Sequence, residues 1–425
     1  MTDQGLVFKG ARVIDPANEV DAVVDVAVQH GVFVDPASLS APEIIDLTGR
    51  VLAPGFVDMH VHLRDPGQTE KEDLQTATAA AAAGGFTTVV AMPNTAPVMD
   101  DPDRVRELLL RAEREGGARV LQTAAMTQGL RGLKLTDFAA LKAAGAVALT
   151  DDGASIQDAS IMREALIQAA QNRMVVLDHC EHAGLSGGGV IAIGEISRKL
   201  SLKGKPVSSE DVMIARNAVL ANETGCPVHL QHVSTAAGIE IARMARWAGW
   251  PVTCEVTPHH FCLTDEAVLT QGANAKMNPP LRSEQHRQAL LKGLCDGTVS
   301  VIATDHAPHT EEEKSRDIAK APNGVIGLET AVRLSLKELY HSGLLELPDL
   351  IAKFTIGPCV VLGLPYGTLT IGRPADITIL DLDAAWTIDV TTFKSKARNS
   401  PFDGWQGRGK AVGTLVGGAW VYRDC

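Results

Sequence analysis

The sequence predicts an α/β fold: a (β/α)8 barrel of the TIM type with a small β-sandwich domain built from both termini. In the middle of the chain, eight short apolar runs are each followed by a helical pattern, and short β-rich segments stand at both ends. With 425 residues, 45% of them hydrophobic, the chain can bury one large core and a smaller one. We therefore expect a β-sandwich of residues 1–54 plus 366–425 and a barrel of residues 55–365.

The two ends of the chain predict strands because short apolar segments alternate with turn residues and no long helical period appears. The same texture returns near the C-terminus, where Gly417-Gly418 is typical of a hairpin turn. We infer one sandwich assembled from both ends. Its expected strands are residues 6–14, 22–34, 44–52, 375–382, 386–390 and 412–422.

The middle of the chain predicts eight strand-then-helix units over roughly 300 residues, as a (β/α)8 barrel requires. Many helices begin near Ser, Thr or Asp and end near Gly. A doubly wound sheet could use the same units, but it would usually carry a glycine-rich phosphate turn, and the first turn here holds His-x-His. The expected strands are 55–62, 87–92, 119–125, 146–150, 174–179, 227–232, 251–256 and 300–304. The expected helices are 74–83, 102–115, 135–144, 161–172, 209–223, 236–248, 284–294 and 326–341.

Charge and composition point to a small ligand. The formal net charge of −12 argues against a nucleic-acid or anionic membrane surface. Residues 1–5 show no secretion signal and no run approaches 18 apolar residues, so we expect a soluble, cytoplasmic protein. The seven cysteines form no C-x-x-C pair, which favours reduced thiols over disulfides or a thiolate zinc site.

The first barrel strand carries the strongest chemical signal. Along it apolar and polar residues alternate, so His60 and His62 should project from one face, about 6.6 Å apart along the strand. Two imidazoles at this spacing can converge on one metal ion. Other expected strands also end in polar residues, namely Asn94, Asp151, Asp152, His179, His232, Asp305, His306 and His309.

Taken singly, each of these residues has a structural explanation, because a lone histidine that ends a strand is more often a hydrogen-bonded support than a ligand. Their joint placement favours a metal site, since the carboxyl ends of all barrel strands lie on one face. Histidine and aspartate without cysteine suit Zn2+ or a similar divalent ion. Four of these histidines with two of these aspartates would suit two ions about 3.5–4 Å apart with one bridging carboxylate.

An ordered set of motifs runs through the whole chain, and with it the sequence resembles the cyclic amidohydrolases of the metal-dependent hydrolase superfamily, most closely the class I dihydroorotases. The motifs are His60-Val61-His62-Leu63-Arg64-Asp65-Pro66-Gly67, Met92-Pro93-Asn94-Thr95, Thr150-Asp151-Asp152-Gly153, Asp178-His179-Cys180-Glu181, His232-Val233-Ser234-Thr235, Asn278-Pro279-Pro280-Leu281-Arg282 and Thr304-Asp305-His306-Ala307-Pro308-His309.

The resemblance implies two Zn2+ ions per subunit and reversible hydrolysis of (S)-dihydroorotate to N-carbamoyl-L-aspartate in de novo pyrimidine biosynthesis. By this implication His60, His62 and Asp305 hold one ion, His179 and His232 hold the other, and Asp152 bridges. Arg64, Asn94 and His309 bind the substrate carboxylate, Asn278 and the Asn323-Gly324 backbone contact the ring, and Asp305 is the catalytic acid–base residue.

Some alternatives stay open. Many relatives bridge their metals with a carboxylated lysine, but residues 146–150 contain none and lead straight to Asp151-Asp152, which disfavours hydantoinase or allantoinase. Only family spacing selects Asp152 over Asp151. Two alternative functions remain: another cyclic amidase, and a non-catalytic dihydroorotase-like subunit that serves as a scaffold for aspartate transcarbamoylase. A homodimer and binding to aspartate transcarbamoylase are expected possibilities, and the roles of four histidines are undecided: His182, His259, His260 and His306.

Overall fold

A parallel eight-stranded sheet forms the centre of the computed structural model, which describes residues 5–424. The first and last strands meet through a parallel bridge between Val61 and His306, and the His62 amide donates to His306 O at 2.8 Å. The sheet therefore closes into the predicted (β/α)8 barrel. Its strands follow one another in chain order: β8 (Phe56–Val61), β9 (Phe86–Ala91), β10 (Arg119–Ala124), β11 (Ala146–Leu149), β12 (Val176–Asp178), β15 (Val228–Leu230), β16 (Val252–Val256) and β17 (Val301–Ile302).

Helices surround this sheet, and aspartate caps fix where several of them begin. The Asp73 carboxylate accepts the Thr76 amide at 2.8 Å, and Gly85 ends the same helix in the left-handed region, with φ of 95°. The surrounding helices are α1 (Leu74–Gly84), α2 (Pro102–Glu115), α3 (Phe138–Ala143), α4 (Ala159–Gln171), α7 (Ser208–Thr224), α8 (Ala236–Trp247), α11 (Glu284–Cys295) and α13 (Ala331–Ser335), which continues as the π-helical η6 (Leu336–Tyr340).

The last predicted helix, 326–341, is wrong at its start. Residues before Ala331 pair with other loops: Val325 O accepts the Ala307 amide at 2.8 Å, and the Ile326 amide donates to Asn399 O at 3.0 Å. These long-range bonds hold the backbone in an extended conformation, so the helix begins only at Ala331.

Several elements between the barrel units are too short for a periodic pattern to predict. One group follows β12, and the others follow β10, β16 or the last strand, β17. They are η3 (Gln128–Leu130), α5 (Ala183–Ser186), β13 (Ile191–Ala192), α6 (Glu195–Lys199), β14 (Gly204–Lys205), α9 (Pro258–Cys262), η4 (Asp265–Ala267), α10 (Val268–Gln271), η5 (Gly272–Ala275), α12 (Glu311–Lys314), α14 (Leu347–Ala352) and α15 (Ile356–Leu362).

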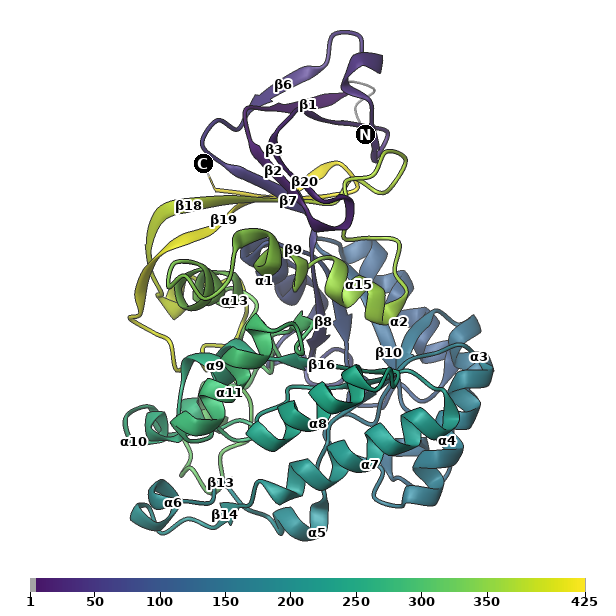
Figure 1. Cartoon of the computed structure of the whole chain (residues 1–425), viewed down its shortest axis with the longest axis vertical. Coiled ribbons are helices and arrows are strands. Elements are labelled where there is room, and N and C mark those ends of the chain that lie inside the picture. The colour runs from purple at the N-terminus through teal and green to yellow at the C-terminus, as the bar shows by residue number, and fades with distance from the viewer. Residues whose placement is uncertain (1–4, 425) are drawn as a thin grey trace.

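Besides the two-stranded sheet of β13 and β14, two further sheets built from both ends of the described chain lie beside the barrel (Figure 1). β7 joins the two ends of the chain because it pairs with β2 in parallel and with β18 in antiparallel orientation. Apolar residues from both ends, such as Phe8, Val13, Ile377 and Leu415, share one core. The elements are β1 (Leu6–Lys9), β2 (Arg12–Asp15), η1 (Pro16–Asn18), β3 (Val20–Val23), β4 (Val26–Gln29), β5 (Val32–Val34), η2 (Pro36–Ser38), β6 (Glu43–Asp46), β7 (Val51–Pro54), β18 (Ile377–Thr387), η7 (Val390–Thr392), β19 (Gln406–Val416) and β20 (Ala419–Arg423).

The predicted strands of these sheets differ from the structure mainly at glycines. Gly10 (φ 76°) and Gly31 (φ 80°) adopt left-handed conformations, so the expected runs 6–14 and 22–34 each break into shorter strands. The expected strand 386–390 is the end of β18, which stops at Thr387. The Gly417-Gly418 turn does connect the paired strands β19 and β20, as predicted.

The segment between β18 and β19, residues 388–405, leaves the sheets and packs against the barrel. Ile388, Phe393 and Phe402 share an apolar cluster with Leu281 and Val325. Residues 388–405 show that the C-terminal part of the chain also packs against the barrel. The expected domain boundaries at 54/55 and 365/366 stay predictions.

Glu329 anchors this segment and carries a pH prediction. Its carboxylate accepts the Lys394 amide at 2.9 Å and the Ser395 amide at 3.2 Å, while burial raises its pKa to about 7. Between about pH 4.5 and 7, the folded protein therefore keeps a proton on Glu329 that the unfolded chain has lost. The free energy of unfolding should fall as pH rises through this range and stay lower above pH 7. We expect Glu329→Gln to flatten that fall.

Unfolding midpoints measured in urea between pH 5 and 8 test this prediction. Glu107→Gln, at an exposed position on α2, is the matched control and should keep the wild-type pH profile. Parallel profiles for wild type and Glu329→Gln would contradict it.

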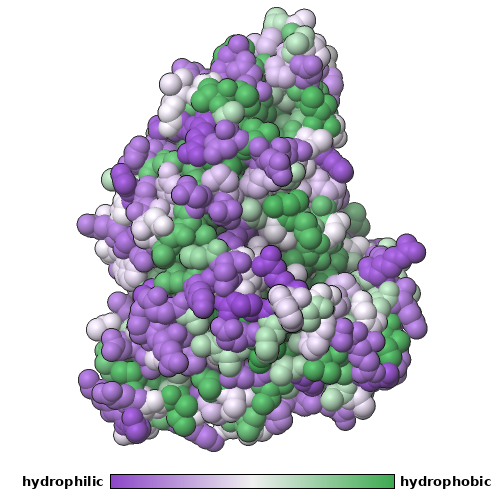
Figure 2. Space-filling view, viewed as in Figure 1, coloured by the Kyte–Doolittle hydropathy of each residue, from purple (hydrophilic) through white to green (hydrophobic). Residues whose placement is uncertain are grey.

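The described surface mixes polar and apolar side chains, and on the face shown in Figure 2 apolar groups are interspersed with hydrophilic ones. Within residues 5–424 no helix is long and apolar enough to cross a membrane. The six cysteines that the structure describes are free. The expectations that concerned residues 1–4 and Cys425 lie outside the described residues.

Candidate active site

A polar pocket of about 280 Å3 opens at the carboxyl ends of the barrel strands. It brings together all the site residues predicted from the sequence except His60, which is fully buried. Gly153 and Ala307 complete the wall. The lining residues are His62, Arg64, Asn94, Asp152, Gly153, His179, His232, Asn278, Asp305, Ala307, His309, Asn323 and Gly324.

One candidate metal group consists of His60, His62 and Asp305, whose ligand atoms all lie within 4.8 Å of one another. The alternation of β8 puts both histidines on one face, as predicted. Asp305 follows β17 in the left-handed region, with φ of 49°, and its Oδ1 lies 3.0 Å from His62 Nε2 and 3.5 Å from His60 Nε2. These three residues match the first predicted ligand set.

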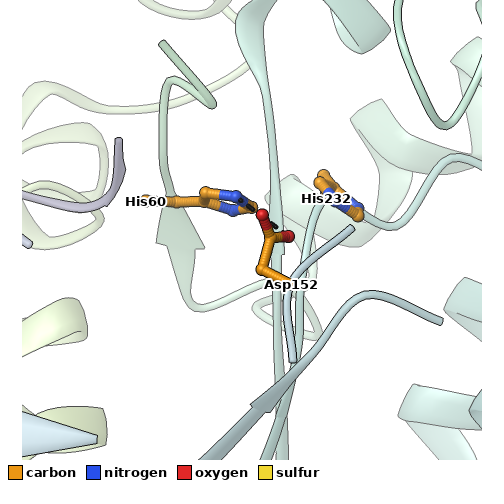
Figure 3. Close-up of side chains that lie close together, drawn as sticks. All are labelled: His60, Asp152 and His232. Carbon is orange, nitrogen blue, oxygen red and sulfur yellow. Dashed lines mark ion pairs between the residues drawn. The ribbon is translucent and has the colours of Figure 1, made fainter. Parts of the chain in front are cut away.

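A second group consists of His60, Asp152 and His232. In Figure 3 the Asp152 carboxylate lies between the rings of His60 and His232. Its Oδ1 is 3.5 Å from His60 Nε2 and its Oδ2 is 3.6 Å from His62 Nε2. Asp152 therefore touches both groups, the position that a bridging carboxylate needs.

The carboxylate of Asp151 has different contacts from that of Asp152. Its carboxylate accepts the Thr127 amide at 3.0 Å and also bonds the Thr127 hydroxyl, and burial raises its pKa to about 6. The structure thus places Asp152, and not Asp151, among the histidines.

His179 lies at the edge of the second group. Its Nδ1 is 2.9 Å from His232 Nε2 but 3.9 Å from Asp152 Oδ1, and its Nε2 is 3.1 Å from Glu181 Oε2. The second candidate group thus contains His60 where the predicted second set has His179, and the ring of His179 lies beside that of His232, with centroids 4.7 Å apart.

The charges in the pocket favour a bound cation. Burial alone would raise the pKa values of Asp152 and Asp305, but His60 and His62 outweigh burial and both values lie below the usual range. Burial, reinforced by His179 and His60, lowers the pKa of His232 to about 3. Against the effect of burial, the nearby carboxylates in turn raise the pKa values of His60 and His179, so a bound cation would replace protons on these rings. Two carboxylates with the imidazoles around them are a donor set for a divalent metal.

Two buried ring nitrogens strengthen this fit. His60 Nε2 and His232 Nδ1 have no hydrogen-bond partner among the described residues. An unpaired buried polar atom is costly, and a metal ligand is one resolution of that cost. The residues present therefore fit a divalent cation.

Glu255 on β16 supports both groups and was not predicted from the sequence. His60 Nδ1 donates to Glu255 Oε1 at 2.7 Å, the His232 amide donates to the same oxygen at 3.2 Å, and His229 Nε2 lies 3.2 Å from Oε2. These bonds direct His60 Nε2 toward the candidate ligands. One feature of the sequence could have indicated Glu255: it is a charged residue within the otherwise uncharged, mostly buried strand β16.

We expect Glu255→Gln to weaken metal binding by about tenfold to a hundredfold, because the carboxylate orients His60 and raises its basicity. Competition with a chromophoric chelator measures the affinity. The control is Glu329→Gln. Glu329 is also a buried glutamate, and its carboxylate accepts the Lys394 and Ser395 amides. Equal metal affinity in wild type and Glu255→Gln would show that Glu255 does not support the site.

Arg64 and His309 form another part of the pocket wall. Arg64 Nε donates to Pro308 O at 3.1 Å, which fixes the plane of the guanidinium, and Nη2 lies 3.4 Å from His309 Nε2. His309 Nε2 donates to Asn323 O at 2.8 Å. Burial, together with Arg64, lowers the pKa of His309 to about 3, so its ring is neutral.

Asn94 and Asn278 connect this wall to the histidines. Asn94 Oδ1 lies 2.9 Å from His62 Nδ1, and its Nδ2 donates to Asp152 Oδ2 at 3.1 Å. Asn278 Nδ2 donates to Glu181 Oε2 at 2.6 Å, while its Oδ1 accepts Lys205 Nζ at 2.6 Å. Lys205 and Glu181 are supports that the sequence motifs alone did not reveal.

The four undecided histidines do not line the pocket. His182 caps α5 and accepts the Leu185 amide at 3.2 Å. His260 contacts Thr257 Oγ1 and Pro279 O at 2.7 and 2.9 Å, and His259 packs against it. His306 accepts the Gly327 amide at 3.2 Å, so its bonds join loops around the pocket.

A closed barrel gathers histidines and aspartates at the carboxyl ends of its strands, and an arginine lines the same pocket. Together with the comparisons that follow, this site defines the class: a hydrolase that acts on cyclic amides. Solved structures of that class share the fold. L-hydantoinase (dihydropyrimidinase) from Arthrobacter aurescens superposes with a TM-score of 0.89 at 27% identity, covering 100% of this chain and 97% of that one. Dihydropyrimidinase from Brevibacillus agri NCHU1002 has a TM-score of 0.85 at 22% identity, covering 99% and 95%.

Sequence comparison is more specific. The family model described as "Dihydro-orotase-like" matches residues 49–237. The dihydroorotase of Geobacter metallireducens is 44% identical over 98% of this chain and 99% of its own length, and that of Pelotomaculum thermopropionicum is 46% identical over 99% of each. The dihydroorotase of Geobacillus sp. (strain WCH70) is 48% identical over 91% of this chain and 90% of its own. The chain belongs to the dihydroorotase family.

Proposed function

We propose that this chain is a zinc-dependent dihydroorotase, which interconverts (S)-dihydroorotate and N-carbamoyl-L-aspartate in de novo pyrimidine biosynthesis. One observation carries the proposal: a single small pocket is lined both by His62, Asp152 and Asp305 and by Arg64 and His309. The first set suits a metal-assisted hydrolysis, and the second suits a carboxylate next to the cyclic amide.

In this proposal His60, His62 and Asp305 hold one zinc ion, His179 and His232 hold the other, and Asp152 is shared. When bound, the ions would polarise the ring carbonyl and lower the pKa of a water molecule. Zinc is proposed because the donors are imidazoles and carboxylates without a thiolate.

Asp305 is the proposed proton carrier. Its carboxylate lines the pocket and is ionised at neutral pH, so it can accept the proton of the attacking water. As the ring carbon–nitrogen bond breaks, the same carboxyl delivers that proton to the departing amide nitrogen. In the ring-closing direction the two transfers run in reverse.

Arg64, with Asn94 and His309, is proposed to bind the exocyclic carboxylate, because a guanidinium can form charge-assisted bonds with it. Asn278 and the Asn323-Gly324 backbone are proposed to contact the ring. Both sets line the same pocket as Asp305, so substrate held between them would present its amide carbonyl to the metal side.

Assays of both reaction directions, with zinc analysed in the same samples and after treatment with a chelator, test this function. Ring opening and closing that disappear with the zinc and return on its addition are expected. Faster turnover of hydantoin or dihydrouracil than of dihydroorotate would instead favour another cyclic amidase. Full metal loading with no turnover of any cyclic amide would favour a non-catalytic subunit.

A homodimer, association with aspartate transcarbamoylase and a cytoplasmic location are further proposals that rest on the family. Light scattering of the purified chain, alone and mixed with that partner, tests the first two. Fractionation of the cells that make it tests the third.

A further inference from the structure

Asn399 belongs to the segment between β18 and β19, far from the barrel in sequence, yet its side chain joins two loops of the candidate active site. The residue is 4% exposed. It does not line the pocket. Any effect on the reaction must therefore pass through the residues that it bonds.

The amide of Asn399 uses all its hydrogen-bonding groups on these loops. Its Oδ1 accepts the His309 backbone amide at 3.1 Å. Its Nδ2 donates to Ala307 O at 3.0 Å and to Gly324 O at 3.1 Å. One side chain thus holds the backbone of two neighbouring loops that both contribute residues to the pocket.

The two loops also pair directly, which gives the side chain a defined place. Val325 O accepts the Ala307 amide at 2.8 Å, and His306 forms a parallel bridge with Val325. Asn399 lies where this short pairing ends, beside Gly324, whose φ of 126° is a conformation that side chains rarely adopt. Its bond to Gly324 O adds to two others at this turn, because the Gly324 amide donates to Lys276 O at 2.9 Å and Lys314 Nζ donates to Gly324 O at 2.9 Å.

We propose that Asn399 is a positioning residue that fixes the spacing between the His309 backbone and the Asn323-Gly324 turn, which lie side by side in the lining of the pocket. The proposal rests on the proposed function, in which these residues contact the substrate. A preformed spacing lowers the entropic cost of binding, so loss of the clamp should weaken substrate binding more than chemistry at Asp305.

A purely structural role would be to fasten the segment, but other bonds already do so. Glu329 accepts the Lys394 and Ser395 amides, and Glu72 Oε1 accepts the Lys396 amide at 3.2 Å. The Asn399 backbone carbonyl also accepts the Ile326 amide at 3.0 Å. These bonds do not involve the Asn399 side chain and should survive its replacement.

The test compares Asn399→Ala with Ser400→Ala in metal-loaded enzyme. Ser400 is the matched control because it is 2% exposed and its hydroxyl accepts an amide of its own segment, that of Phe402. Steady-state kinetics with dihydroorotate, zinc per chain, thermal midpoint and amide hydrogen exchange are measured for each variant.

For Asn399→Ala we expect KM to rise about tenfold with kcat nearly unchanged, zinc content equal to wild type, and faster exchange of the His309 amide. Ser400→Ala should match wild type in all four measurements. Asn399→Asp keeps the acceptor for His309 but sets a carboxylate against Ala307 O and Gly324 O, so it should raise KM while the His309 amide stays protected.

Wild-type KM in a folded Asn399→Ala enzyme would overturn the proposal, as would an equal rise in Ser400→Ala. If Asn399→Ala fails to fold, Asn399→Asp decides by the same KM criterion. Absence of dihydroorotate turnover in the wild type would refute the proposed function instead, and the exchange of the His309 amide would then still report whether the clamp exists.

Discussion

Asp305→Asn is expected to lower kcat by about a hundredfold to ten-thousandfold in both reaction directions, since it removes the group that carries the proton. Asparagine keeps the shape of the side chain and an oxygen that faces His62 and His60, which lie 3.0 and 3.5 Å from Asp305 Oδ1. It cannot take up a proton from water. The loss should appear in kcat at every pH at which the wild type is active.

The measurement is kcat with dihydroorotate and with carbamoyl aspartate, beside the zinc content of the same preparation. Asp151→Asn is the matched control because that buried carboxylate bonds Thr127 and does not line the pocket. It should retain kcat within a few-fold. A zinc-loaded Asp305→Asn enzyme with near wild-type kcat would refute the proton-carrier role.

Arg64→Met is expected to lower kcat/KM for dihydroorotate by about tenfold to a hundredfold, from the loss of charge-assisted hydrogen bonds to its carboxylate. Burial lowers the pKa of Arg64, and Asp305 and Asp152 partly offset that effect, so the guanidinium stays charged. Methionine fills the same space without the charge. Zinc content should not change, because Arg64 is not a ligand.

The decisive quantity is a ratio of specificity constants. Dihydrouracil lacks the carboxylate, so its turnover should change far less than that of dihydroorotate in Arg64→Met. Arg111→Met is the control: Arg111 forms two 2.9 Å bonds to Asp65 and lies outside the pocket, so the ratio should stay at the wild-type value. Equal losses for both substrates would show that Arg64 supports the site in general.

Positions that depend on local pattern were predictable. Aspartates at helix starts and glycines at helix ends marked α1 and α2, and the alternation of β8 placed His60 beside His62. The start of α13 was not predictable, because bonds from Val325 and Ile326 to distant loops override the helical pattern there. Short elements such as β13 and β14 give too few residues for any period to show.

By itself the sequence determined the barrel, the sheets from both termini and the histidines and aspartates at the strand ends, because parallel strands bring their carboxyl ends to one face; Asn278, Asn323 and Gly324 followed only from the family resemblance. Only the tertiary structure decided which of two adjacent carboxylates, Asp151 or Asp152, faces the histidines. It alone also revealed Glu255 behind His60, 195 residues away, and Asn399 between Ala307 and Gly324. These contacts join segments distant in the chain, and their geometry depends on how strands and loops pack together, which no local pattern records.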